Sequence, residues 1–130
     1  MTYWPVVDES LAMAQILVID DDPDIRELLK TTLESAGHRV VITENGSKGV
    51  QAFKEKRPDL VITDLFMPEQ EGLETIKQLR MEHPDVSILA ISGRPTGGTM
   101  LTVAKRLGAK AVLQKPFLPE ELLKLVEETL

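Results

Sequence analysis

Acidic, hydroxyl and basic side chains stand at the ends of short apolar runs along this 130-residue chain. Asp20 and Asp21 follow the run ILVI and Asp64 follows LVIT, while Ser92 ends ILAIS and Lys115 comes shortly after AVL. If the ends of these runs meet, the three carboxylates repel one another unless their pKa values rise or a cation neutralises them. Mg²⁺ fits the second solution, because it takes oxygen ligands and usually keeps several waters.

This set of side chains permits a specific chemistry. An ionised Asp64 is already a nucleophile and needs no general base, while the metal would neutralise charge on an incoming phosphoryl group. Lys115 and Ser92 would then contact the phosphoryl oxygens, and the product would be an aspartyl phosphate. Taken alone, the lysine is explained as a solvated surface residue and the serine as a turn residue. Their shared position after apolar runs is what favours a site.

Five apolar runs predict the strands that must carry these residues. The runs are rich in β-branched residues and do not alternate with polar ones, which is typical of strands covered on both faces, as in a parallel sheet. The predicted strands lie at 16–19, 40–42, 60–62, 88–91 and 111–113.

Segments with helical spacing separate the strands. Residues 46–56 show the weakest pattern, with Val50 and Phe53 as core candidates, and are still predicted to form a helix. The four clearer apolar faces are Ile25, Leu28, Leu29, Leu33 and Ala36; Leu73, Ile76 and Leu79; Met100, Val103, Ala104 and Leu107; and Leu118, Leu122, Leu125, Val126 and Thr129.

Capping and breaking residues agree with these segments. Asp22 before Pro23 is typical of an N-cap followed by proline at the first helical position. Capping thus explains Asp22 but not the two preceding aspartates, Asp20 and Asp21, which remain candidates for the site. Gly37 and Gly108 stand where helices should stop. Gly93, Pro95, Gly97 and Gly98 make the first part of the segment 92–108 poor in helix.

The alternation of strands and helices predicts a doubly wound, three-layer α/β domain with a five-stranded parallel sheet over residues 15–130. In such a sheet, ligands bind outside the carboxyl ends of the strands, where the polar residues described above stand. Residues 1–14, which hold the only Trp and the only Tyr, are expected to form a flexible extension or linker.

Composition narrows the possible functions. A formal charge of -6 argues against a nucleic-acid-binding face, and the absence of cysteine excludes disulfides and thiolate metal sites. No apolar run approaches the roughly twenty residues that span a bilayer, and the N-terminal residues do not resemble a signal peptide. These features predict a cytoplasmic protein without a membrane partner.

Four motifs resemble those of the receiver domain of bacterial response regulators, the CheY-like family: ILVIDDDPDIRELL, LVITDLFMPEQEG, ILAISG and GAKAVLQKPF. The resemblance covers residues 15–130 and implies the flavodoxin-like strand order 2-1-3-4-5. It implies that Asp64 is the phosphoacceptor and also a metal ligand, and that Asp20 and Asp21 bind Mg²⁺ directly or through water, together with the backbone carbonyl of Phe66.

The same resemblance implies the remaining parts of the site and its partners. Ser92 matches the switch hydroxyl, and Lys115 matches the family's lysine, with a cis peptide expected before Pro116. The phosphoryl donor would be a sensor histidine kinase or a histidine phosphotransfer protein. Phosphorylation would switch binding of a downstream protein through the face around the fourth helix, fifth strand and fifth helix. The domain would catalyse only its own phosphorylation and slow dephosphorylation, as a monomer or weak dimer.

Two alternative functions remain open. Val112 occupies the position on the fifth strand that is usually aromatic, so a phosphorylation-independent interaction module is one alternative. An aspartate-nucleophile phosphatase or phosphotransferase is another, although it requires a carboxylate two residues after the nucleophile, where Phe66 stands. We also predict that Phe66 and Arg94, which flank the site, tune the lifetime of the phosphoryl group.

Overall fold

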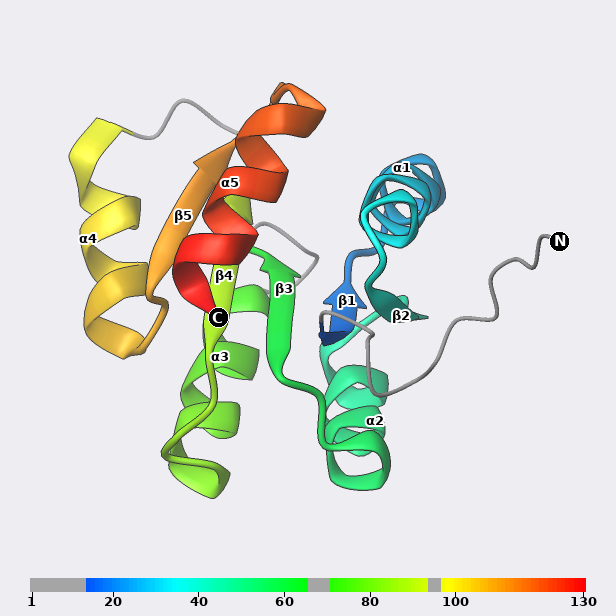
Figure 1. The fold of residues 1–130 in the computed structure, drawn as a ribbon. Coiled ribbons are helices and arrows are strands. Elements are labelled where there is room, and N and C mark those ends of the chain that lie inside the picture. Colours follow the sequence, from blue (N-terminus) through cyan, green and yellow to red (C-terminus); the bar gives the residue numbers. More distant parts are fainter. Residues whose placement is uncertain (1–13, 66–70, 94–96) are drawn as a thin grey trace, which may run out of the picture.

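The computed structural model describes residues 14–65, 71–93 and 97–130. Strands and helices alternate along these residues, and the strands form a single all-parallel sheet in the order β2-β1-β3-β4-β5 (Figure 1). The predicted fold and strand order are therefore confirmed. The strands are β1 (Gln15–Ile19), β2 (Arg39–Thr43), β3 (Leu60–Asp64), β4 (Ile88–Ser92) and β5 (Ala111–Gln114), and the helices are α1 (Pro23–Ser35), α2 (Gly46–Lys56), α3 (Glu71–Glu82), α4 (Gly97–Leu107) and α5 (Pro119–Thr129).

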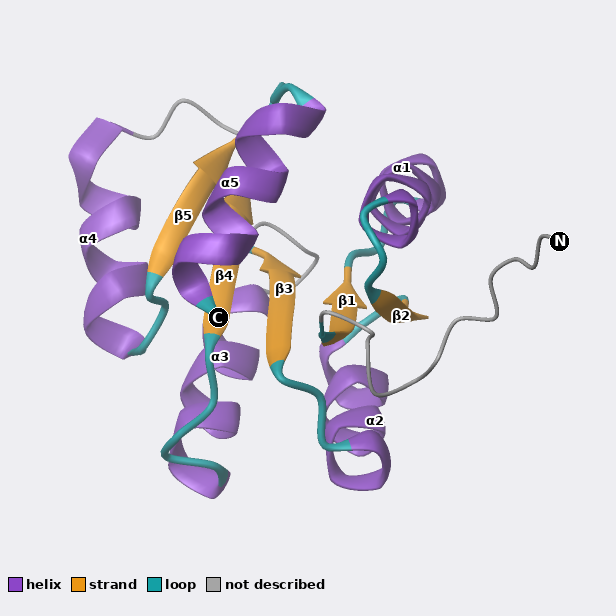
Figure 2. Ribbon diagram, in the orientation of Figure 1, coloured by secondary structure: helices purple, strands orange, loops and turns teal. Residues whose placement is uncertain are grey.

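Helices cover both faces of the sheet (Figure 2). Buried residues of α1 and α5 pack with one face, and buried residues of α2, α3 and α4 pack with the other. Both β3 and β4 are buried along their whole length, which explains why their sequences do not alternate. The strand register pairs Ile19 with Thr63 and Asp64 with Ile91, so the carboxyl ends of the central strands lie at one edge.

Local signals in the sequence set several of the helix boundaries. The Asp22 carboxylate accepts a hydrogen bond from the backbone N–H of Asp24, which confirms the predicted N-cap. The helix predicted over 46–56 is confirmed as α2, whose N-cap is Asn45. Gly108, just beyond α4, has a φ of 129°, and a Cβ there would lie 2.6 Å from the Nε atom of Arg80. Glycine is therefore required at this stop.

Three expectations about the helices are wrong. The fourth helix already begins at Gly97, although two glycines open it; burial of Ala104 in the core offsets the poor propensity of its first turn. Leu28 and Leu118 belong to apolar helix faces that should be covered, yet they are 44% and 61% exposed. Leu118 precedes the first turn of α5 as its N-cap, which places it outside the buried stripe of that helix.

Across the described residues, none of the helices combines the length and the apolar character required to span a bilayer. The predicted extension, apart from Ala14, lies outside the described residues.

Candidate functional site

Three carboxylates converge at the carboxyl edge of the sheet. Asp20 follows β1 and Asp64 ends the neighbouring β3, while Asp21 stands one residue beyond Asp20. One oxygen of each lies within 4.8 Å of the others. Asp20 and Asp64 are buried, with 1% and 5% exposure, whereas Asp21 is exposed to solvent. The predicted convergence is thus confirmed, and a set of close oxygen donors open on one side suits a hard divalent cation that keeps some of its waters.

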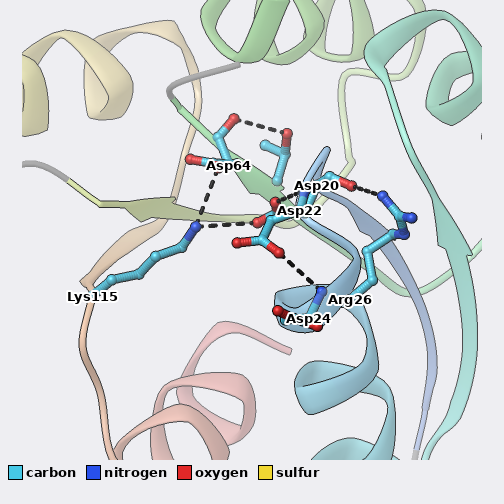
Figure 3. A network of polar contacts seen from close by, with 7 residues as sticks. Asp20, Asp22, Asp24, Arg26, Asp64 and Lys115 are labelled. Atoms are coloured by element: carbon cyan, nitrogen blue, oxygen red, sulfur yellow. Dashed lines mark hydrogen bonds and ion pairs between the residues drawn. The ribbon is translucent and has the colours of Figure 1, made fainter. Parts of the chain in front are cut away.

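Lys115 reaches this cluster from the segment after β5. Its Nζ atom lies 3.2 Å from Oδ2 of Asp64 and 3.3 Å from Oδ2 of Asp20 (Figure 3). The backbone N–H of Lys115 donates to the carbonyl oxygen of Ser92 at 2.7 Å, and the peptide bond to Pro116 is cis, as expected. The long lysine stem therefore carries a positive charge across β4 to the carboxylates on β1 and β3.

Electrostatics at the cluster favour a bound cation. Burial raises the pKa of Asp20, and the charge of Asp64 adds to this effect, while the Asp22 N–H and Lys115 oppose it. Burial works against the charge of Lys115, but the two carboxylates outweigh it and raise the pKa of the lysine. Three carboxylates thus face one ammonium group, which leaves negative charge for a divalent cation to neutralise.

Ser92 ends β4, next to the strand that carries Asp64, and is 1% exposed. It therefore lies at the predicted edge of the sheet. A turn residue would be exposed to solvent, whereas Ser92 is buried. Val112 is half-buried in β5 and pairs in register with Ala90. Phe66 and Arg94 lie outside the described residues, and so does the predicted metal contact through the Phe66 carbonyl.

Two residues next to the site were not predicted from the sequence. Arg26 of α1 donates from Nη1 to the backbone carbonyl of Asp20 at 2.7 Å. Gly72 of α3 packs so closely that a Cβ would lie 2.1 Å from the carbonyl oxygen of Asp64. Neither contact has a sequence signal beyond the residue type, because each depends on how a helix packs against the end of a strand.

Comparisons with known proteins agree with this geometry. Residues 16–127 match the response regulator receiver domain family. The chain is 38% identical over 120 residues to the DNA-binding transcriptional regulator NtrC of Azospirillum brasilense, covering 92% of this chain and 25% of that protein. It is 35% identical over 112 residues to the probable C4-dicarboxylate response regulator DctR of Halalkalibacterium halodurans, covering 85% of this chain and 48% of that protein. The chain therefore spans half or less of these relatives.

A solved structure is similar over nearly its full length. The chemotaxis response regulator CheY4 of Vibrio cholerae superposes with a TM-score of 0.84 at 33% identity, covering 91% of this chain and 99% of that one. Phosphorylation-based switching is characteristic of receiver domains, which act in two-component signalling rather than as metabolic enzymes. The match over residues 16–127 shows that the chain belongs to the response regulator receiver domain family.

Proposed function

We propose that this receiver accepts a phosphoryl group on Asp64 in a reaction that depends on Mg²⁺. The observation that carries the proposal is the convergence of Asp20, Asp21 and Asp64 with the Lys115 ammonium group at one edge of the sheet. An oxygen of the Asp64 carboxylate attacks phosphorus, the bond between phosphorus and the donor breaks, and the donor leaves with the bonding electrons. The result is an aspartyl phosphate, formed without a general base.

Each neighbouring residue has a role in this reaction. Asp20 and Asp21 would hold Mg²⁺, directly or through water, and the bound ion would supply positive charge against the phosphoryl oxygens. Lys115 now pairs with Asp64, so its ammonium group is placed to hold a phosphoryl oxygen once Asp64 is modified. The Ser92 hydroxyl, at the end of the adjacent strand, is the donor proposed to stabilise the product.

Phosphorylation adds about two negative charges beside Lys115 and Ser92. We propose that both are drawn towards the phosphoryl group and that the face formed by α4, β5 and α5 changes its affinity for a downstream protein. A nearly complete shift between two states requires on the order of 5 kcal/mol of differential interaction. One or two new charge-assisted hydrogen bonds supply only part of this, so the downstream partner supplies the rest.

An apolar groove beside Lys115 supports a protein donor. The groove has a volume of about 380 Å³ and contains Lys115 in its wall, so its occupant would approach the phosphoacceptor. We propose that it receives a helix of a sensor histidine kinase or a histidine phosphotransfer protein, which presents a phosphohistidine to Asp64. The groove is lined by Ile25, Leu28, Gly93, Lys115, Pro116 and Phe117.

A charge introduced into this groove is expected to slow phosphorylation by a protein donor but not by a small phosphodonor. Leu28→Arg places a cation on apolar surface and is expected to slow phosphorylation by a phosphohistidine protein about tenfold, the cost of a moderate interface residue. Phosphorylation by a small phosphodonor is expected to be unchanged. Met81→Arg on α3, where Met81 is 73% exposed, is the matched control. Equal slowing with both donors would argue against docking at the groove.

The proposed donor also indicates where in the cell the domain acts. Phosphohistidine proteins of two-component systems act in the cytoplasm, so we place this domain there, as a monomer or weak dimer. The net charge of -6 disfavours nucleic acid as a direct partner of this chain. The domain turns over no metabolite, and hydrolysis of its own acyl phosphate is expected to be slow.

The first experiment is the intact mass of the protein after incubation with Mg²⁺ and acetyl phosphate or phosphoramidate. A gain of one phosphoryl group is expected with Mg²⁺, and chelation of the metal by EDTA is expected to abolish it, because the carboxylates then repel the incoming anion. A protein that gains no mass from these donors or from a phosphohistidine protein would be a phosphorylation-independent module. An equal gain with and without the metal would contradict the role of Asp20 and Asp21.

A further inference from the structure

We propose that Arg26 is a positioning residue of the metal site, which fixes the peptide that joins Asp20 to Asp21. This inference rests on the proposed function, because it assigns a role in the same acidic cluster. Arg26 does not touch the carboxylate oxygens in the described contacts. Its Nη1 atom instead donates to the backbone carbonyl of Asp20 at 2.7 Å (Figure 3).

The local fold brings Arg26 to this place. Asp22 and Pro23 start α1, and the backbone N–H of Arg26 donates to the carbonyl of Asp22 at 3.0 Å to close the first turn. Side chains of a helix lean towards its N-terminus, so the half-buried arginine turns back towards the end of β1. The capping signal that starts α1 therefore also sets the approach of the guanidinium group.

The contact matters because of the atom that it holds. A peptide unit is planar, so the carbonyl of Asp20 and the N–H of Asp21 move as one body. Fixing that carbonyl fixes the direction in which the chain leaves towards Cα of Asp21. Within the part of the chain that the structure describes, the exposed Asp21 side chain makes no hydrogen bond, so its placement relies on its backbone.

Arg26 completes the set of partners around Asp20. The N–H of Asp20 donates to the Thr43 carbonyl at 3.1 Å, its Oδ1 accepts from the Asp22 N–H at 2.9 Å, and its Oδ2 faces Lys115 at 3.3 Å. The backbone carbonyl is the remaining polar atom, and Arg26 is its partner. A planar, multiply donating guanidinium is better suited to fixing a peptide orientation than a mobile ammonium group.

Charge and position predict opposite effects on Mg²⁺ binding. If Arg26 acted only as a positive charge near the cluster, removing it would strengthen binding of a cation. If it positions the two carboxylates, removing it weakens binding, as loss of an outer-shell partner does in other metal sites by about 10–100-fold. The sign of the change therefore separates the two roles without any measurement of phosphorylation.

The experiment is calorimetric titration of the metal-free protein with MgCl₂ for the wild type, Arg26→Met, Arg26→Gln and Lys30→Met. Arg26→Met keeps an apolar stem and is expected to raise the Kd about tenfold. Arg26→Gln lacks the charge but keeps an amide donor, and it is expected to recover part of the affinity. Lys30→Met removes a cation from the same helix, where Lys30 pairs with Glu34, and is expected to leave the Kd unchanged.

Amide hydrogen exchange without metal provides a second readout. Exchange of the Asp20 and Asp22 amides, which bond to the Thr43 carbonyl and to Asp20 Oδ1, is expected to be faster in Arg26→Met but not in Lys30→Met. Tighter Mg²⁺ binding by both neutral Arg26 variants, or unchanged exchange in Arg26→Met, would overturn the positioning role. If the wild type bound no Mg²⁺, the proposed function would fail, while exchange would still decide whether Arg26 fixes this backbone.

Discussion

Asp64→Asn is expected to abolish phosphoryl acceptance from every donor. The substitution keeps the size of the side chain and replaces an anionic oxygen with an amide, which does not attack phosphorus. The other two carboxylates of the cluster, Asp20 and Asp21, are not expected to take over, because they are the residues proposed to hold the metal ion. The variant also loses one of the oxygen donors of the acidic cluster, so its affinity for Mg²⁺ is expected to fall.

Intact mass and peptide mapping after incubation with acetyl phosphate and Mg²⁺ check this expectation. The matched control is Asp85→Asn, which neutralises an exposed aspartate at the opposite edge of the sheet, before β4, and is expected to gain a phosphoryl group like the wild type. A phosphoryl group found on Asp64→Asn at wild-type stoichiometry would place the acceptor at another residue. The peptide that carries it would then identify that residue.

Much of the fold could be predicted because its signals are local or repeat along the chain. A strand covered on both faces needs an apolar run, and β3 and β4 are of this kind. The N-cap at Asp22 depends only on its neighbours, since the carboxylate binds an N–H two residues away. The site followed because parallel strands bring their carboxyl ends to one edge.

Other features depend on packing between distant segments and have no local signal. The apolar spacing of α1 shows which residues share one face of the helix, but not how much of that face the rest of the protein covers. Leu28 lies on this face and is nevertheless 44% exposed. The sequence shows an arginine on the first turn of α1 but not the angle at which the helix meets β1, on which the Arg26 contact depends. The early start of α4 at Gly97 likewise reflects the burial of residues further along that helix.

Lys115→Met is expected to slow phosphorylation by acetyl phosphate about 100-fold, the effect of losing one preorganised donor at an oxyanion. It is also expected to lower the free energy of unfolding of the metal-free protein at neutral pH. Removing one partner of a buried ion pair leaves uncompensated charge, which costs about 3–5 kcal/mol in a dry interior. Because Lys115 is 19% exposed, the expected loss is smaller, roughly 2 kcal/mol.

The loss of stability in Lys115→Met is expected to depend on pH in a characteristic way. Burial already raises the pKa of Asp20 in the folded protein, and loss of the nearby ammonium group is expected to raise it further. A carboxyl group with a raised pKa binds more protons in the folded than in the unfolded state, so stability falls as the pH rises through the folded pKa. The variant is therefore expected to regain stability as the pH is lowered towards the ordinary pKa of an aspartate.

Denaturant unfolding at several pH values, with and without Mg²⁺, measures these effects together. Lys110→Met is the matched control, because Lys110 lies just before β5 and donates to the Ser87 hydroxyl far from the carboxylates. Its stability is expected to show the pH dependence of the wild type. Mg²⁺ is expected to restore more stability to Lys115→Met than to the control, since a bound cation replaces the missing positive charge and binds only the folded state. A Lys115→Met protein whose stability matched that of the control at every pH would mean that the ammonium group does not neutralise Asp20 and Asp64 in the resting site.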